Sequence, residues 1–174
     1  MHRDGRRFVL TFALVAAALF AFYCLPYELF GAKGDWLEGY LACYARMAGF
    51  VLHLVDASVS VTGRTIVGRF SLEIIRSCDA IEVNILFASA VLACPARATK
   101  KALALVLGLA ALVLVNLLRI TSLYYVGLYR MAWFETVHLE LWPLGMVGMA
   151  AISFVLWARW LGGEPGGQLD APVA

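Results

Sequence analysis

Hydrophobic residues in this chain gather in long runs that are nearly free of charge. Four runs stand out, namely Phe8–Leu25, Ala80–Ala96, Ala102–Leu118 and Leu139–Ala158. About 20 helical residues cross the ~30 Å hydrocarbon core of a bilayer. The pattern therefore predicts an all-α polytopic membrane protein with four transmembrane helices. Between the last two runs, Thr121–Val137 is rich in Tyr, Trp and Phe, which is typical of an interfacial aromatic belt.

The first run also has the basic start and apolar centre of a secretory signal, because Arg3, Arg6 and Arg7 precede it. The residues around Ala21–Tyr23, however, make a poor cleavage site, which requires small side chains. The run is long enough to span the membrane, and we expect it to be retained as the first helix.

Residues 36–57 form an amphipathic segment between the first two runs. Its polar residues fall within roughly 80° of arc on a helix, and they are Glu38, Arg46, His53 and Asp56. This stripe is typical of a helix in the membrane interface, but the segment could instead be a true span, which would invert the rest of the topology. The short basic loop with Arg97, Lys100 and Lys101 favours an interfacial helix and a cytoplasmic loop, since short loops weigh most in the positive-inside rule.

From Ser58 to Ile75 the sequence changes to β-branched residues interrupted by glycines. Alternation on both sides of the Gly63-Arg64 pair predicts a short β-hairpin. Bare strands cannot lie in hydrocarbon, so we expect the hairpin at the water interface, leading Cys78 to the membrane surface. If the basic loop is cytoplasmic, this is the extracytoplasmic side. Residues 1–161 are predicted to form a single membrane-embedded domain, and the Gly- and Pro-rich residues 162–174 a disordered tail.

Composition agrees with the membrane assignment, with 63% hydrophobic residues, 15% charged residues and a mean hydropathy of +0.82. The net charge of +2 is small and dispersed, and nothing indicates a nucleic-acid partner. The four cysteines form no CxxC pair and have no metal-ligand spacing with the three histidines, so no cofactor or metal is expected. Three of them, Cys24, Cys43 and Cys94, are expected to pack as small hydrophobic residues.

Cys78 and Arg119 occupy mirror-image positions around the basic loop. Cys78 lies 19 residues before Arg97, and Arg119 lies 18 residues after Lys101. Both side chains should therefore emerge at the same depth on one membrane face. Asn116 shares a helix face with Arg119 at i, i+3 spacing. Ionisable groups near lipid are costly and usually pair or work, which makes the thiol a candidate nucleophile beside a cation.

His138 begins the next apolar run on the same face and adds a candidate base. Taken alone, Arg119 could be a snorkelling anchor at a helix end, and a histidine at a helix start is usually structural. Asp79 and Glu82 lie within a turn of Cys78. They could orient the cation or the imidazole, or form a polar helix start that the helix dipole favours.

Together these motifs resemble the exosortase/archaeosortase family. The family has a Cys in a short polar motif that opens a membrane helix, an Asn-x-x-Arg at the outer end of the next helix, and a His that opens the last. The resemblance is carried by Arg76–Ala96, Asn116–Gly127 and Trp133–Trp142, and it is greatest to the short, single-domain exosortase H type. Many members have Gly two residues after the Cys, where this chain has Ala80.

The resemblance implies a membrane-embedded cysteine transpeptidase or protease at the outer face of the bacterial inner membrane. Its substrates would be secreted proteins with a C-terminal sorting tail, similar to a PEP-CTERM signal, cleaved through a thioacyl intermediate. The acceptor would be linked to exopolysaccharide or lipid. Cys78 would be the nucleophile, with Arg119 and His138 as its catalytic partners. The resemblance also favours the interfacial placement of residues 36–57.

Two other classes of protein also fit part of the sequence pattern. A non-catalytic membrane subunit or small transporter would use Cys78, Arg119 and His138 as interface anchors, but the spans contain almost no charges that could line a path. A membrane thiol oxidoreductase would need a second cysteine near Cys78, and the missing CxxC pair counts against it.

Overall fold

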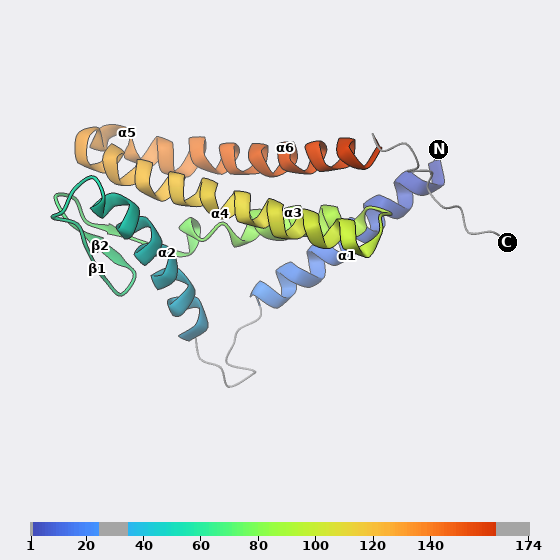
Figure 1. Cartoon of the computed structure of the whole chain (residues 1–174), viewed down its shortest axis with the longest axis horizontal. Coiled ribbons are helices and arrows are strands. Elements are labelled where there is room, and N and C mark those ends of the chain that lie inside the picture. Colours follow the sequence, from blue (N-terminus) through green and yellow to red (C-terminus); the bar gives the residue numbers. More distant parts are fainter. Residues whose placement is uncertain (1, 25–34, 163–174) are drawn as a thin grey trace.

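Two long apolar helices form the frame of the computed structural model, which describes residues 2–24 and 35–162. Helix α4 (Ala98–Tyr129) and the helical stretch that ends in α6 (Trp142–Gly162) lie side by side and run in opposite directions (Figure 1). Helix α3 (Ile81–Ala93) lies against both of them, and α1 (His2–Cys24) packs on α3. The described chain is mostly helical, as the apolar runs predict.

Three helical stretches among the described residues are long and apolar enough to cross a membrane, namely Gly5–Cys24, Ala98–Tyr129 and Met131–Leu161. The fourth predicted span is shorter than expected, since α3 has 13 residues. This length gives about 20 Å of helix, against the ~30 Å core of a bilayer. Helix α3 stops before Pro95 because a proline disfavours helical backbone at the residue before it, and Cys94 is accordingly extended.

Helix α4 continues through the residues that were expected to form a separate aromatic belt. It has 32 residues, or about 48 Å of helix, so Arg119 lies within the helix and not at its end. The C-terminal third of α4 packs against the sheet region, where the rings of Phe70 and Tyr124 meet edge to face with centroids 6.0 Å apart. Burial of these rings explains why the helix continues beyond the apolar run.

The last helical stretch begins earlier than predicted, and His138 does not open it. Helix α5 (Met131–Thr136), a π turn (Val137–Leu141) and α6 follow one another directly. Pro143 gives a physical reason for the wide turn, because it has no N–H for the carbonyl four residues earlier and its ring crowds that carbonyl. The N–H of Trp142 bonds to the carbonyl of Val137, five residues back, which re-forms the ladder around the gap.

The predicted hairpin is confirmed and belongs to a three-stranded antiparallel sheet. β1 (Ser60–Thr62) pairs with β2 (Thr65–Val67), and β2 pairs with β3 (Leu72–Glu73). Gly63 closes the turn between β1 and β2 at a φ of +60°, which glycine adopts without steric cost.

Helix α2 (Asp35–His53) covers this sheet and confirms a helix in the amphipathic segment, although it ends four residues earlier than predicted. The core between α2, the sheet and α4 includes Leu41, Tyr44 and Leu52 of α2, Ile66 of β2, and Ile120 and Leu123 of α4. The placement of α2 in a membrane interface stays a prediction. The predicted tail, residues 162–174, lies outside the described residues except for residue 162.

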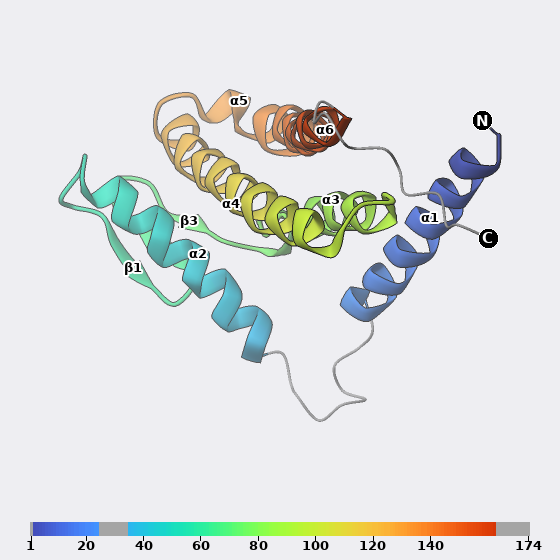
Figure 2. The same cartoon turned by 45° about the vertical axis from the view of Figure 1, so that its right-hand side comes forward.

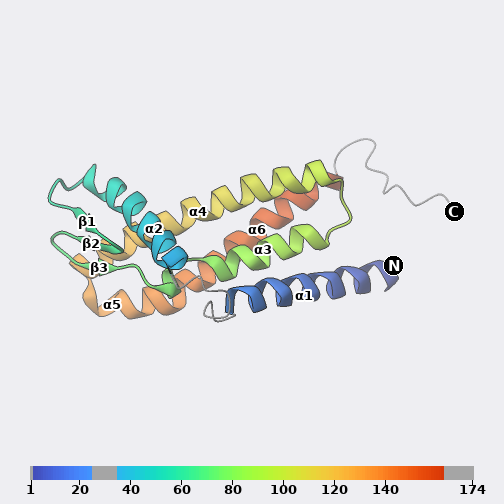
Figure 3. The ribbon, with the colours of Figure 1, turned by 90° about the horizontal axis from the view of Figure 1, so that it is seen from below.

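The sheet and α2 lie at one end of the bundle, and the short α3–α4 connection lies at the other (Figures 1 and 3). Figure 2 shows α1 on the far side of α3 from α4 and α6. The first helix packs mainly on α3, and the rings of Phe8 of α1 and Phe154 of α6 also meet, with their centroids 6.4 Å apart.

Gly108 sets the close approach of α3 and α4, because a Cβ at this position would overlap the ring of buried Phe87. We expect Gly108→Ala to lower the free energy of unfolding by about 1–3 kcal/mol through overpacking. Gly148→Ala is the matched control. No heavy atom lies within 4 Å of its added Cβ, so alanine should stabilise that helix by about 0.5–1 kcal/mol. Thermal unfolding in detergent, followed by tryptophan fluorescence, measures both changes, and equal behaviour would contradict the close packing.

Candidate functional site

Cys78 ends a 3₁₀ turn, Arg76–Cys78, that connects β3 to α3. The N–H of Cys78 donates to the carbonyl of Ile75 over 2.8 Å, and the N–H of Asp79 donates to the carbonyl of Arg76 over 3.2 Å. Cys78 is only 2% exposed. The polar motif of the sequence is thus a tight turn that buries its thiol.

Ala80 carries the chain from this turn into α3 with a φ of +58° and a ψ of +11°. For a residue other than glycine this left-handed conformation costs about 1–2 kcal/mol. The turn therefore explains in physical terms why glycine suits this position in the family that the chain resembles.

Asn116 joins α4 to the turn that carries the cysteine. Its side chain is fully buried, and its Nδ2 donates to the carbonyl oxygen of Cys78 over 2.9 Å. Because one end of this hydrogen bond is on α4 and the other in the turn that precedes α3, the turn is held against this part of α4. The structure thus brings the turn of Cys78 beside this part of α4, and the common depth of the two in a membrane stays a prediction.

Arg119 lies one helical turn beyond Asn116 and is 4% exposed. Its charge is within electrostatic range of both Cys78 and Asp79. The backbone carbonyl of Arg119 accepts a hydrogen bond from Ser122 Oγ over 2.8 Å, and Trp142 Nε1 donates to the same Oγ over 3.0 Å. These bonds tie the start of α6 to α4 at the backbone of Arg119.

His138 lies in the π turn before α6 and is half-buried. Its ring stacks on Phe134, with ring centroids 5.8 Å apart and an interplanar angle of 23°. The imidazole is within electrostatic range of Arg119. The three candidate residues therefore gather at one place, although His138 arrives from the middle of a helix. A π turn at such a place is common at functional sites.

The site also contains two tyrosines that the sequence did not single out. Tyr23, at the end of α1, donates its hydroxyl to Asp79 Oδ2 over 2.9 Å, and Tyr40 of α2 donates to the carbonyl oxygen of Asp79 over 3.1 Å. No periodic or spacing signal marks these tyrosines, because their approach depends on how α1 and α2 pack.

Asp79 is 2% exposed and lies outside the helices that can cross a membrane. Burial raises the pKa of its carboxyl above the ordinary value, against the opposing effect of the hydrogen bonds from the Ile81 N–H and Tyr23. Burial likewise raises the pKa of Tyr40. Asp79 belongs to the site as a buried group and not as a solvated helix start.

The other three cysteines lie apart from this site. The expectation that all three pack as small hydrophobic residues is wrong for Cys24 and Cys43, whose side chains are exposed, while Cys94 is partly buried. Within residues 2–24 and 35–162, no group of three His, Cys, Asp or Glu side chains could hold a metal ion.

Fold and site together define a multi-pass helical membrane protein with a buried thiol, a guanidinium and an imidazole gathered beside a small sheet. The family model for transmembrane exosortases matches residues 3–161, and the chain belongs to this family. Membership implies a transpeptidase-like enzyme that acts on proteins carrying a sorting signal. Comparisons with curated proteins and with solved structures gave no match.

Relief of the left-handed conformation at Ala80 is directly testable. We expect Ala80→Gly to raise the free energy of unfolding by about 0.5–1 kcal/mol, since the steric cost of the Cβ exceeds the added entropy of the unfolded chain. Ala88→Gly, within α3, should instead lower it by about 0.5–1 kcal/mol. Thermal unfolding of the two variants in the same detergent measures the opposite signs. A loss of stability in both would show that Ala80 is not left-handed.

Proposed function

We propose that this protein is a cysteine transpeptidase that cleaves the C-terminal sorting tail of secreted proteins at the outer face of the inner membrane. Cys78 is the nucleophile, and Arg119 and His138 are its catalytic partners. The observation that carries this proposal is their gathering at one site, from the turn before α3, from α4 and from the π turn, in a chain of the exosortase family.

In the proposed topology α1, α3, α4 and the α5–α6 stretch each cross the membrane, while α2 lies in the outer interface with the sheet above it. Arg119 lies about 32 Å along α4 from Ala98, close to the thickness of a hydrocarbon core. At the opposite end Lys100 Nζ lies 5.3 Å from the ring centroid of Trp160, which groups basic and aromatic residues as at a cytoplasmic boundary.

The short length of α3 fits this topology. The extended residues after Ala93 cover part of the distance that the helix does not, and Cys78 then lies at the edge of the hydrocarbon and not in open water. A sorting tail that ends in its own transmembrane helix would present its cleavage site at the same depth.

The chemistry begins when His138 takes the proton of the Cys78 thiol and the sulfur attacks the scissile carbonyl carbon of the substrate. As the C–S bond forms, the carbonyl oxygen takes up negative charge, which the guanidinium of Arg119 stabilises by donating hydrogen bonds. The C–N bond then breaks, and the leaving amine takes a proton from His138. The products are the freed tail and a thioacyl enzyme.

The second half of the reaction transfers the acyl group. A hydroxyl or amine of an acceptor linked to exopolysaccharide or lipid, or a water molecule, attacks the thioester carbon and gives its proton to His138. The C–S bond breaks, and the departing sulfur takes this proton back from His138, which restores the thiol of Cys78 and the neutral imidazole. Burial of the thiol in the free enzyme favours transfer to a bound acceptor over transfer to bulk water.

Cys78→Ala should abolish tail removal, because no other group near the site can form the thioester. The assay co-expresses each variant with a tail-bearing candidate substrate from the same genome and reads the substrate's C-terminus by mass spectrometry. Cys94→Ala is the matched control and should cleave at the wild-type rate. Cleavage by the Cys78→Ala variant would mean that the thiol is structural and would favour a non-catalytic role.

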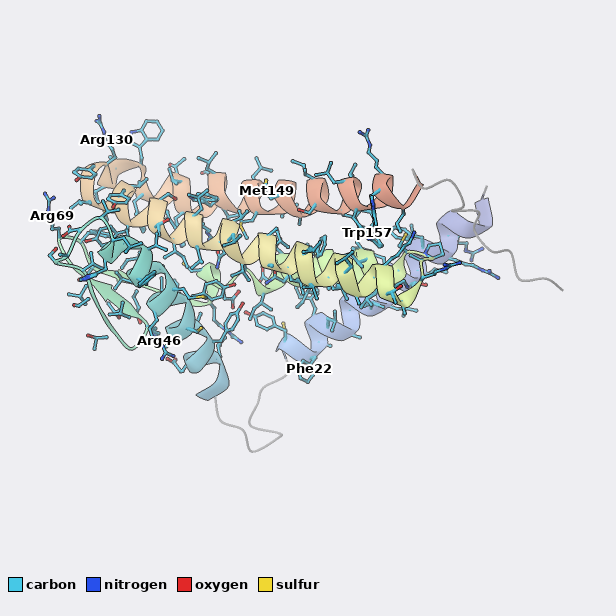
Figure 4. All side chains as sticks on the ribbon, in the orientation of Figure 1. Phe22, Arg46, Arg69, Arg130, Met149 and Trp157 are labelled. Atoms are coloured by element: carbon cyan, nitrogen blue, oxygen red, sulfur yellow. The ribbon has the colours of Figure 1, made fainter. Side chains whose placement is uncertain are left out.

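Arg119→Lys should lower the cleavage rate by about 10²–10³-fold, since lysine keeps the charge but loses the fixed fork of donors at the oxyanion. His138→Gln should lower it by about 10²–10⁴-fold by removing the proton-transfer group. Arg130→Lys, at the exposed end beside α5 (Figure 4), serves as the control and should leave the rate unchanged. Equal rates for the Arg119 and Arg130 variants would sink the oxyanion role.

A further inference from the structure

Asp79 is the one buried carboxylate among the residues that the structure describes. It directly follows the proposed nucleophile, yet the proposed reaction gives it no role. An uncompensated charge in such a place is costly, because burial favours the neutral form of a carboxyl group. The position of Asp79 therefore needs a physical reason.

Three separate elements hold this residue. Tyr23 of α1 donates to its Oδ2 over 2.9 Å, and the N–H of Ile81, at the start of α3, donates to its Oδ1 over 2.9 Å. Tyr40 of α2 donates to its backbone carbonyl over 3.1 Å. Both carboxylate oxygens thus accept hydrogen bonds, and the residue next to Cys78 is fixed from both sides of the site.

Charged groups of both signs also lie around the carboxylate of Asp79. The titratable and charged groups that face it from the surrounding elements are Tyr23 of α1, Tyr40 of α2, Arg76 of the turn, Glu82 of α3 and Arg119 of α4. The guanidinium of Arg76 lies over the ring of Tyr23, with its Cζ 5.3 Å from the ring centroid. Arg119 is the buried cation of this group, and it faces Cys78 as well.

We propose that Asp79 is a positioning residue: anchored by Tyr23 and by the Ile81 N–H, its carboxylate fixes the turn that carries Cys78 and holds the charge of Arg119 beside the thiol. The proposal rests on the proposed function, because the thiol and the guanidinium are the groups that it positions. It also makes α1 a part of the site, since Tyr23 supplies the anchor from the last turn of that helix.

The experiment measures the reactivity of Cys78 with iodoacetamide as a function of pH, in full-length protein in detergent with Cys24, Cys43 and Cys94 replaced by Ala. Asp79→Asn keeps an acceptor for the Ile81 N–H but removes the charge. Tyr23→Phe removes only the hydroxyl. Tail removal from the candidate substrate is measured for the same variants, and tryptophan fluorescence reports whether each one is folded.

In the Asp79→Asn variant we expect the midpoint of the alkylation profile to move to lower pH by about one unit, because the charge of Arg119 is no longer balanced and favours the thiolate. Tail removal should fall at least about tenfold, since the guanidinium is no longer held for the oxyanion. Tyr23→Phe should shift both readouts in the same direction by less. Glu38→Gln is the control, an exposed carboxylate of α2 that pairs with Arg64 at the surface and is not among the groups facing Asp79, and it should leave both unchanged.

Two results would overturn the positioning role. One is a change in alkylation rate by the same factor at every pH with no shift of the midpoint, which is what a merely loosened turn would give. The other is that the Asp79→Asn and Tyr23→Phe variants behave the same as the Glu38→Gln control in both measurements. If Asp79→Asn does not fold, Tyr23→Phe decides between these outcomes. The alkylation profile needs no substrate, so absence of tail removal in every protein, wild type included, would contradict the proposed function while the midpoints still test Asp79.

Discussion

The hydrogen bond from Asn116 Nδ2 to the carbonyl oxygen of Cys78 is the constraint on which the site depends. Both groups are buried in apolar surroundings, where losing one partner leaves the other unsatisfied at a cost of about 1–3 kcal/mol. The bond fixes the turn before α3 to one level of α4. Arg119, one helical turn farther along α4, is thereby held at the level of the thiol, and the depth of the whole site follows from a single polar contact.

Helix α4 packs against different elements along its length. Its first half is apolar and packs closely on α3, where Gly108 admits the ring of Phe87. Its C-terminal third packs on α2 and the sheet through Tyr124 and Phe70. Arg119 lies between the two, and its buried charge is within electrostatic range of Cys78 and Asp79 in the turn, which offsets part of the cost of burying a guanidinium.

The parts of the site that follow from chain length could be predicted from the sequence, and those that follow from packing could not. The spacing around the basic loop sets the depth of Cys78 and Arg119, because the thickness of a bilayer fixes how many helical residues lie between its faces. Tyr23 and Tyr40 lie 56 and 39 residues from Asp79, and nothing local marks their approach. Pro95 and Pro143 are local sequence signals for the early end of α3 and for the π turn, but a hydropathy pattern alone does not register either proline.

Several locally unfavourable features of the structure lie together at the site. Ala80 holds a left-handed conformation, the helix that carries His138 widens into a π turn, and Asp79 keeps a carboxylate out of water. Each has an alternative of lower free energy: a glycine at position 80, a regular α-helix around His138, and a neutral side chain at position 79. Strain of this kind persists where the surrounding structure over-determines it, and it gathers where function requires an unusual geometry. Here α1, α2, the sheet and α4 together hold the short turn that carries Cys78. The unfavourable features that they impose lie beside its thiol.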